Sequence, residues 1–165
     1  MTKIHKKKGK RKKRKHKAKN GTNVIQTIGN PTSCNVLCYS SLFFITNMVT
    51  SFYKGYLLYS SFFAFLTITS LIVHSNDNIY TNSIDKLGIA FIITYGSYIV
   101  YKKTDINNIL QVFMVVLCVL FCIWVYIYGY IRKEYCFSQD RCIADRSHCL
   151  MHLLSSFGHH MIIFL

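Results

Sequence analysis

Acidic residues are scarce in this chain of 165 residues, which contains 6 Asp and Glu against 20 Lys and Arg. The first acidic residue is Asp77, so almost half of the sequence carries no negative side chain. At the same time, 52% of the residues are hydrophobic. A soluble protein of this size needs a more polar surface than this composition provides. The composition therefore argues against a soluble domain and predicts a membrane protein built as one domain.

The chain also lacks several motifs that carry chemistry in other proteins. It contains no phosphate-binding glycine loop, no Ser-His-Asp motif and no sequence typical of a folded nucleic-acid module. We therefore do not expect nucleotide-dependent or serine-nucleophile chemistry, and any function must be sought among the remaining polar side chains.

The positive charge is concentrated at the N-terminus, where 12 of the 20 Lys and Arg residues lie between Lys3 and Lys19. Such a run repels itself and cannot bury apolar surface, so residues 1–33 are predicted to form a disordered tail. The part from Lys6 to Lys19 could bind anionic lipid head groups, or nucleic acid nonspecifically through its phosphates. It could also be a nuclear-type import signal, or a cytoplasmic tail that only fixes the topology.

The remainder, residues 34–165, is predicted to be an all-α transmembrane domain. Long runs with few charges favour membrane-spanning helices, because unpaired backbone groups are costly in lipid. Five spans are expected, at residues 36–52, 56–74, 84–101, 109–131 and 148–165. The positive-inside rule places the basic N-terminus in the cytoplasm, so the chain is expected to be an integral, multi-pass membrane protein.

This topology brings three polar positions to one depth in the membrane. The second span would end on the cytoplasmic side at His74, the third would begin there near Asp85, and the fifth would begin there at His148. Ser70 and His74 are four residues apart, as are His148 and His152, so each pair shares a helix face. Three imidazoles at one level could bind Zn²⁺, which in catalytic sites keeps a fourth position for water. A carboxylate and a hydroxyl beside them could orient that water and accept its proton.

The same residues carry a resemblance to a known family. The stretches TSLIVHSNDNIYTNSIDKLGI and HCLMHLLSSFGHH resemble the alkaline ceramidase and adiponectin-receptor superfamily of membrane hydrolases. The resemblance implies that His74, His148 and His152 hold Zn²⁺, and that Ser70 and Asp85 are the catalytic helpers of a zinc-activated water. It also implies that the substrate is a membrane lipid with a ceramide-like amide bond, or a related ester.

The chain differs from that family in two respects. Family members usually have seven helices, whereas five are expected here, so part of the wall around a lipid pocket would be missing. The ceramidase branch has an acidic calcium site near its N-terminus, and no acidic residue precedes Asp77 here. The alternative is a non-catalytic multi-pass membrane protein whose basic tail binds anionic lipid or nucleic acid.

Each candidate residue also has an ordinary structural interpretation. The three histidines could be interfacial polar residues at helix ends. Asp85 could pair with Lys86 or cap the N-terminus of its helix, and Ser70 could bond to its own helix backbone. His159 and His160 are expected to support the helix or the pocket wall rather than to bind metal.

The cysteines offer a rival metal site next to the last span. Its ligands would be Cys136, Cys142, His148 and Cys149. The gap between the first two cysteines is wider than the spacing common in zinc sites, which makes this set less typical than the three histidines.

Overall fold

The computed structural model describes residues 31–75 and 78–165, and the side chains of all these residues except 31–35. Every regular element in these two ranges is helical, which confirms the predicted all-α fold. The helices are α1 (Pro31–Ser41), α2 (Phe43–Tyr53), α3 (Leu57–Ser75), α4 (Ile79–Lys103), α5 (Ile109–Arg132) and α6 (Arg141–Ile163), with short 3₁₀ helices η1 (Ile106–Asn108) and η2 (Tyr135–Phe137). The basic run lies outside the described residues.

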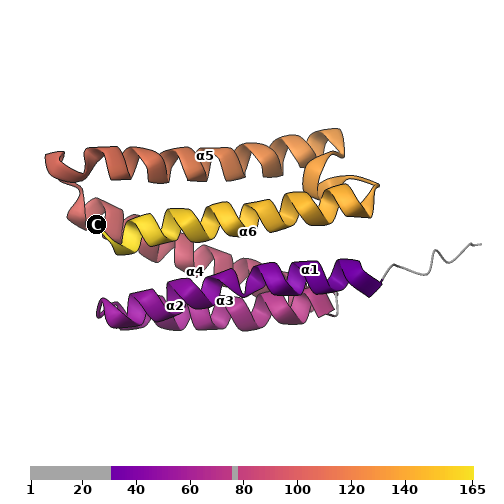
Figure 1. Cartoon of the computed structure of the whole chain (residues 1–165), viewed down its shortest axis with the longest axis horizontal. Helices are drawn as coiled ribbons and strands as arrows, with labels where there is room; N and C mark the ends of the chain where they lie inside the picture. The colour runs from indigo at the N-terminus through magenta and orange to yellow at the C-terminus, as the bar shows by residue number, and fades with distance from the viewer. Residues whose placement is uncertain (1–30, 76–77) are drawn as a thin grey trace, which may run out of the picture.

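The helices form a bundle in which successive rods run in opposite directions (Figure 1). α1 and α2 continue one another, α3 returns beside them, and α4, α5 and α6 each reverse direction again. α6 packs against α1 and α2 on one side and against α5 on the other, while α3 packs against α1, α2 and α4. The end of α3 and the beginnings of α1, α4 and α6 therefore lie at one end of the bundle, as the topology predicted.

Four helical segments of the described chain are long and apolar enough to cross a membrane. They are Val36–Tyr53, Leu57–Ser75, Ile79–Lys103 and Ile106–Phe137. This composition is compatible with the predicted multi-pass membrane protein. The fifth predicted span, at residues 148–165, falls within α6, a 23-residue helix that is not one of the four. Charged residues in the first turns of α6 and histidines along it lower its hydropathy.

Three predicted spans differ from the structure. The helix of the fifth, α6, begins at Arg141 rather than at residue 148, because the Asp140 side chain accepts a hydrogen bond from the backbone N–H of Cys142 and caps it. The third begins at Ile79 rather than at residue 84, because the Asn78 side chain accepts hydrogen bonds from the backbone N–H groups of Tyr80 and Thr81 and caps the helix. The first is interrupted at Leu42, whose N–H donates to the carbonyl of Tyr39 in a tighter turn.

The interruption at Leu42 follows two adjacent serines. The hydroxyls of Ser40 and Ser41 both donate to the carbonyl oxygen of Leu37, at 2.9 and 3.0 Å. Serine side chains that bond back to their own helix commonly bend it, and serine pairs are frequent at kinks. Both serines are buried, at 5% and 0% exposure, so the bend faces the inside of the bundle.

The apolar core lies mainly among α2, α3, α4 and α6. Its buried side chains are Phe44, Tyr59, Phe63, Leu66, Ile92, Ile99, Val115, Ile162 and Ile163. Gly96 allows α4 to approach closely, since a Cβ at this position would lie 2.7 Å from the Tyr59 hydroxyl oxygen. In contrast, most large apolar side chains of α5 are exposed, as expected for a helix that faces lipid.

Candidate metal centre

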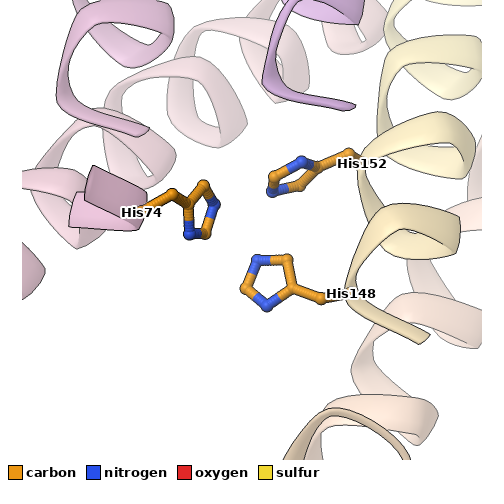
Figure 2. Close-up of side chains that lie close together, drawn as sticks. All are labelled: His74, His148 and His152. Atoms are coloured by element: carbon orange, nitrogen blue, oxygen red, sulfur yellow. The ribbon is translucent and has the colours of Figure 1, made fainter. Parts of the chain in front are cut away.

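Three histidine side chains converge where α3 ends and α6 begins (Figure 2). One ring nitrogen from each of His74, His148 and His152 lies within 4.8 Å of the other two. The ring centroids are 5.0 Å apart for His74 and His148, 5.5 Å for His74 and His152, and 4.7 Å for His148 and His152. The structure thus brings together the three predicted ligands, and this His triad could hold a metal ion.

The helices explain why the three rings meet. His148 and His152 are one turn apart on α6 and project from the same face, because residues at i and i+4 lie above one another. His74 lies in the last turn of α3. α1 packs against both helices and holds them at the distance that lets their side chains touch.

The spacing of the His triad suits a tetrahedral transition metal after a small adjustment. Nitrogen ligands bound at 2.0–2.1 Å to one tetrahedral ion lie about 3.3 Å from each other, so the rings need to close by at most about 1.5 Å. Imidazole ligands suit zinc, copper, iron and nickel, whereas magnesium, calcium and manganese prefer oxygen. The donor set therefore fits a borderline transition metal but does not single out zinc.

A carboxylate that sequence reasoning missed lies next to the His triad. Asp145 is three residues before His148 on α6 and interacts with it electrostatically. Its Oδ2 atom is buried and has no hydrogen-bond donor among the described residues. Such an oxygen is costly to bury unless a positive charge lies nearby. This observation independently fits a cation at the His triad.

His152 is the most buried member of the His triad, and it has a hydrogen-bond partner outside the triad. Its Nδ1 lies 2.9 Å from the hydroxyl oxygen of Ser40 on α1. His152 is 9% exposed, whereas His74 and His148 are half-buried. Histidine ligands of metals usually bond through their second nitrogen to such a partner, which orients the ring.

Ser70 is buried one turn before His74 on α3, at 2% exposure. Its Oγ lies 3.0 Å from the Oγ of Ser41 on α1. The two adjacent serines of α1 therefore contact two different helices of the site. Ser41 bonds to the α3 hydroxyl, and Ser40 bonds to the α6 imidazole.

Asp85 lies on α4 and faces α3. Its Oδ1 accepts a hydrogen bond of 3.1 Å from the hydroxyl of Thr69, the neighbour of Ser70. The structure thus brings Asp85 to the helix that carries Ser70 and His74, in contact with Thr69. The alternative that Asp85 caps its helix is wrong, because Asn78 occupies the N-cap of α4.

His159 and His160 have partners away from the His triad, in agreement with their expected supporting role. His159 Nδ1 lies 2.5 Å from the hydroxyl oxygen of Tyr59, and His160 Nε2 lies 2.9 Å from Oγ1 of Thr46. Between them and the His triad, Ser156 donates to the side-chain oxygen of Asn47. One face of α6 is therefore polar along much of its length and is hydrogen-bonded to α2 and α3.

The rival cysteine site does not assemble. Among the described residues, the His triad is the one group of three or more His, Cys, Asp and Glu side chains with metal-binding spacing. Cys136 Sγ lies 3.3 Å from the sulfur of Met151, and Cys149 Sγ lies 3.6 Å from the carbonyl oxygen of Val36. Cys142 is exposed.

An apolar groove of about 600 Å³ lies between α5 and α6. Its lining residues are Met114, Leu117, Cys118, Leu120, Phe121, Trp124, Leu150 and Leu154. Leu150 is two residues from both His148 and His152, so it points to the other side of α6. The groove therefore faces away from the His triad.

Comparisons with protein-family models, with curated proteins and with solved structures found no significant match. The resemblance to alkaline ceramidases accordingly depends on the two quoted stretches and on the spacing of their polar residues. Of the side chains around the His triad, Asp145 could have been found by the same helical spacing that selected His148 and His152. Ser40 and Ser41 carry no such signal, because only the packing of α1 brings them to the site.

Proposed function

We propose that this protein is a zinc-dependent membrane hydrolase that cleaves an amide or ester bond of a membrane lipid. The observation that carries the proposal is the convergence of His74, His148 and His152 from two helices that are distant in the sequence. Ionisable residues inside a membrane bundle are rare and costly unless they serve a function. The buried, unpartnered carboxylate oxygen of Asp145 beside them supports a cation rather than a purely structural cluster.

The His triad would provide three neutral nitrogen ligands and leave one position open. A zinc ion bound there would act as a Lewis acid and lower the pKa of a water molecule at the open position. His152 would bind through Nε2, because its Nδ1 is bonded to Ser40. His74 and His148, which are half-buried, form the more accessible side from which a substrate would enter.

Ser70 would position a water molecule as a hydrogen-bond acceptor. If the single hydroxyl hydrogen of Ser41 goes to the Leu37 carbonyl, Ser70 would be the donor in the bond between the two serines. Ser70 then has lone pairs for a water O–H but no hydrogen left for a developing oxyanion. This assigns Ser70 to the water rather than to the substrate carbonyl.

Asp85 would accept the proton that the reaction releases. Oδ1 lies 3.1 Å from the Thr69 hydroxyl oxygen, so Oδ2 would be the oxygen that takes up a proton. Ser70 lies on α3 and Asp85 contacts Thr69, its neighbour on the same helix, so both helpers would act from the α3 side. General bases act through such short proton transfers within hydrogen-bond reach of water.

A lipid substrate fits the surroundings of the site. Four helical segments are apolar enough to lie in a bilayer, and α4 and α5 expose large apolar side chains over most of their length. A substrate with acyl chains would reach the His triad from within the membrane, while its polar bond would lie at the depth of the helix ends. We propose that this end of the bundle is cytoplasmic, in line with the basic N-terminal sequence.

Metal analysis of the purified protein tests the first part of the proposal. The full chain in lipid nanodiscs should hold about one zinc ion, and His148→Ala and His152→Ala should each lose it. His160→Ala is the matched control, since this imidazole bonds to Thr46 and should leave the zinc content unchanged. Absence of stoichiometric zinc, or its retention in both triad variants, would refute the metal centre.

Turnover of ceramide and of acyl-ester lipids tests the second part. Asp85→Ala should abolish hydrolysis while it keeps zinc, and deletion of residues 2–30 should retain hydrolysis. Equal turnover by wild type and Asp85→Ala would remove Asp85 as the base. Zinc binding without any turnover would favour the alternative of a non-catalytic multi-pass protein that recruits lipid or nucleic acid through its tail.

A further inference from the structure

We propose that Ser40 is a positioning residue that holds His152 in the Nδ1–H tautomer and thereby makes Nε2 its metal ligand. This inference depends on the metal centre proposed above. Ser40 lies outside the sequence motifs, and its bond to the His triad is the one to His152 Nδ1. Its effect would pass entirely through the His152 ring.

The hydrogen bonds around Ser40 are the basis for assigning the protons. Ser40 Oγ is 2.9 Å from the Leu37 carbonyl oxygen and 2.9 Å from His152 Nδ1. A carbonyl oxygen can only accept, so the single hydroxyl hydrogen of Ser40 goes to Leu37. Toward His152, Ser40 can then only accept, which requires a hydrogen on Nδ1. The neutral imidazole carries one hydrogen, so Nε2 is left with its lone pair free.

The orientation of the ring directs this lone pair into the site. One nitrogen of His152 points to the space between the three rings, where His74 and His148 also point (Figure 2). Phe44 packs against the His152 ring with centroids 5.3 Å apart and planes tilted by 60°. Ser40 is 5% exposed and His152 is 9% exposed, so bulk water has little access to replace the serine as the partner of Nδ1.

The bend between α1 and α2 is the structural feature that makes this contact possible. Ser40 lies at the end of α1, just before the interruption at Leu42, and its bond to Leu37 fixes the hydroxyl rotamer. α1 packs against α6 as well as α3, although it carries none of the three ligands. The role of α1 at the site would therefore be to determine, through Ser40, which ring nitrogen of His152 carries the hydrogen.

Zinc affinity in three variants provides the first test. Ser40→Ala should bind zinc about 10- to 100-fold more weakly than wild type, the range usual for loss of a partner of a histidine ligand. Ser40→Thr keeps the hydroxyl and should restore most of the affinity. Ser60→Ala is the matched control, because Ser60 is also buried and donates to a backbone carbonyl, that of Met48, but contacts no imidazole.

The tautomer itself provides a readout that does not depend on metal or activity. Nitrogen NMR spectra of the metal-free protein labelled in histidine distinguish Nδ1–H from Nε2–H, and the His152→Ala spectrum assigns the His152 signals. Wild type should show His152 with its hydrogen on Nδ1, and Ser40→Ala should shift it towards a mixture. An Nε2–H tautomer in wild type would overturn the proposal.

The two measurements separate the failure of this inference from failure of the metal centre. If wild type binds no zinc, the centre fails, but the NMR result still decides the tautomer assignment. If wild type binds zinc and Ser40→Ala binds it equally well, the positioning role fails and the metal centre stands. A loss that Ser40→Thr does not rescue, or that Ser60→Ala shares, would assign the effect to packing and also refute the role of the hydroxyl.

Discussion

At the scale of single residues, two groups of polar side chains in the bundle have different tasks. One group surrounds the His triad and consists of the hydroxyls of Ser40, Ser41 and Ser70 with the carboxylate of Asp145. The other group ties α6 to its neighbours through bonds such as that between Tyr59 and His159. Buried polar groups need partners in either case. Only the first group would respond to a metal ion.

Asp145→Asn should weaken metal binding without unfolding the protein. The substitution keeps the size of the side chain but removes the negative charge next to His148, so we expect zinc affinity to fall about tenfold. Competition with a coloured zinc chelator in detergent measures this change. Asp105→Asn is the control, because Asp105 is exposed in the connection between α4 and α5, away from the His triad. Equal affinities in the two variants would contradict a role for Asp145.

At the scale of elements, α6 is the helix on which the site depends. It supplies two of the three histidines and contacts α1, α2, α4 and α5. Its polar face explains its place in the bundle, since Ser156 and the histidines at 152, 159 and 160 all find partners on α1, α2 or α3. The same polar face is the reason that its composition does not mark it as a membrane span. Neighbouring helices, rather than lipid, solvate this side of α6.

The close approach of α4 to α3 and α6 predicts a sharp steric effect at Gly96. Gly96→Val should destabilise the protein by about 1–3 kcal/mol, because its side chain would overlap the Tyr59 hydroxyl and disturb the bond to His159. Thermal unfolding in detergent, monitored by circular dichroism, checks this expectation. Ala90→Val on the exposed side of the same helix should change stability by less than about 0.5 kcal/mol. Similar losses in both variants would indicate a general effect on α4 instead.

At the scale of the whole molecule, the antiparallel order of the helices puts the His triad and the start of α1 at the same end. Cys149 contacts the Val36 carbonyl and Cys38 contacts Ser75, which confirms that the first described side chains of α1 lie beside the ligand helices. α1 therefore begins at the end of the bundle that carries the site, and the basic run precedes α1 in the sequence. We propose that the residues of this run bind anionic lipid head groups there, close to where a lipid substrate would enter.

Binding to vesicles tests this proposal for residues 1–30. The full chain should bind vesicles rich in phosphatidylserine more tightly than zwitterionic vesicles, by about 1 kcal/mol for each Lys or Arg close to the surface. Deletion of residues 2–30 should abolish the difference, and raising the salt concentration should reduce it because mobile ions screen exposed charges. The deletion should leave zinc content unchanged. Salt-independent binding, or equal binding by the deleted chain, would exclude the electrostatic explanation.

The amino-acid sequence by itself determined the helical class, the apolar segments and the three histidines. Long runs with few charges leave helices as the favoured way to satisfy the backbone, and the four-residue spacing of His148 and His152 requires a shared face. The alternation of spans then placed His74 at the same end. The helical class and the shared helix face follow from the local sequence, and the end at which His74 lies follows from the number of spans before it. None of these features depends on how the helices pack.

Only the tertiary structure decided which side chains surround those histidines. Ser40 and Ser41 come from a helix with no motif, and they reach the site because α1 bends at Leu42 and packs between α3 and α6. The tertiary structure also decided against the rival cysteine site. Cys136 contacts the sulfur of Met151 and Cys149 contacts the carbonyl oxygen of Val36, so these thiols do not converge on one point. The spacing in the sequence predicts which residues share a helix face. The hydrogen bonds that would fix the protonation of these residues depend instead on contacts between helices that are distant along the chain.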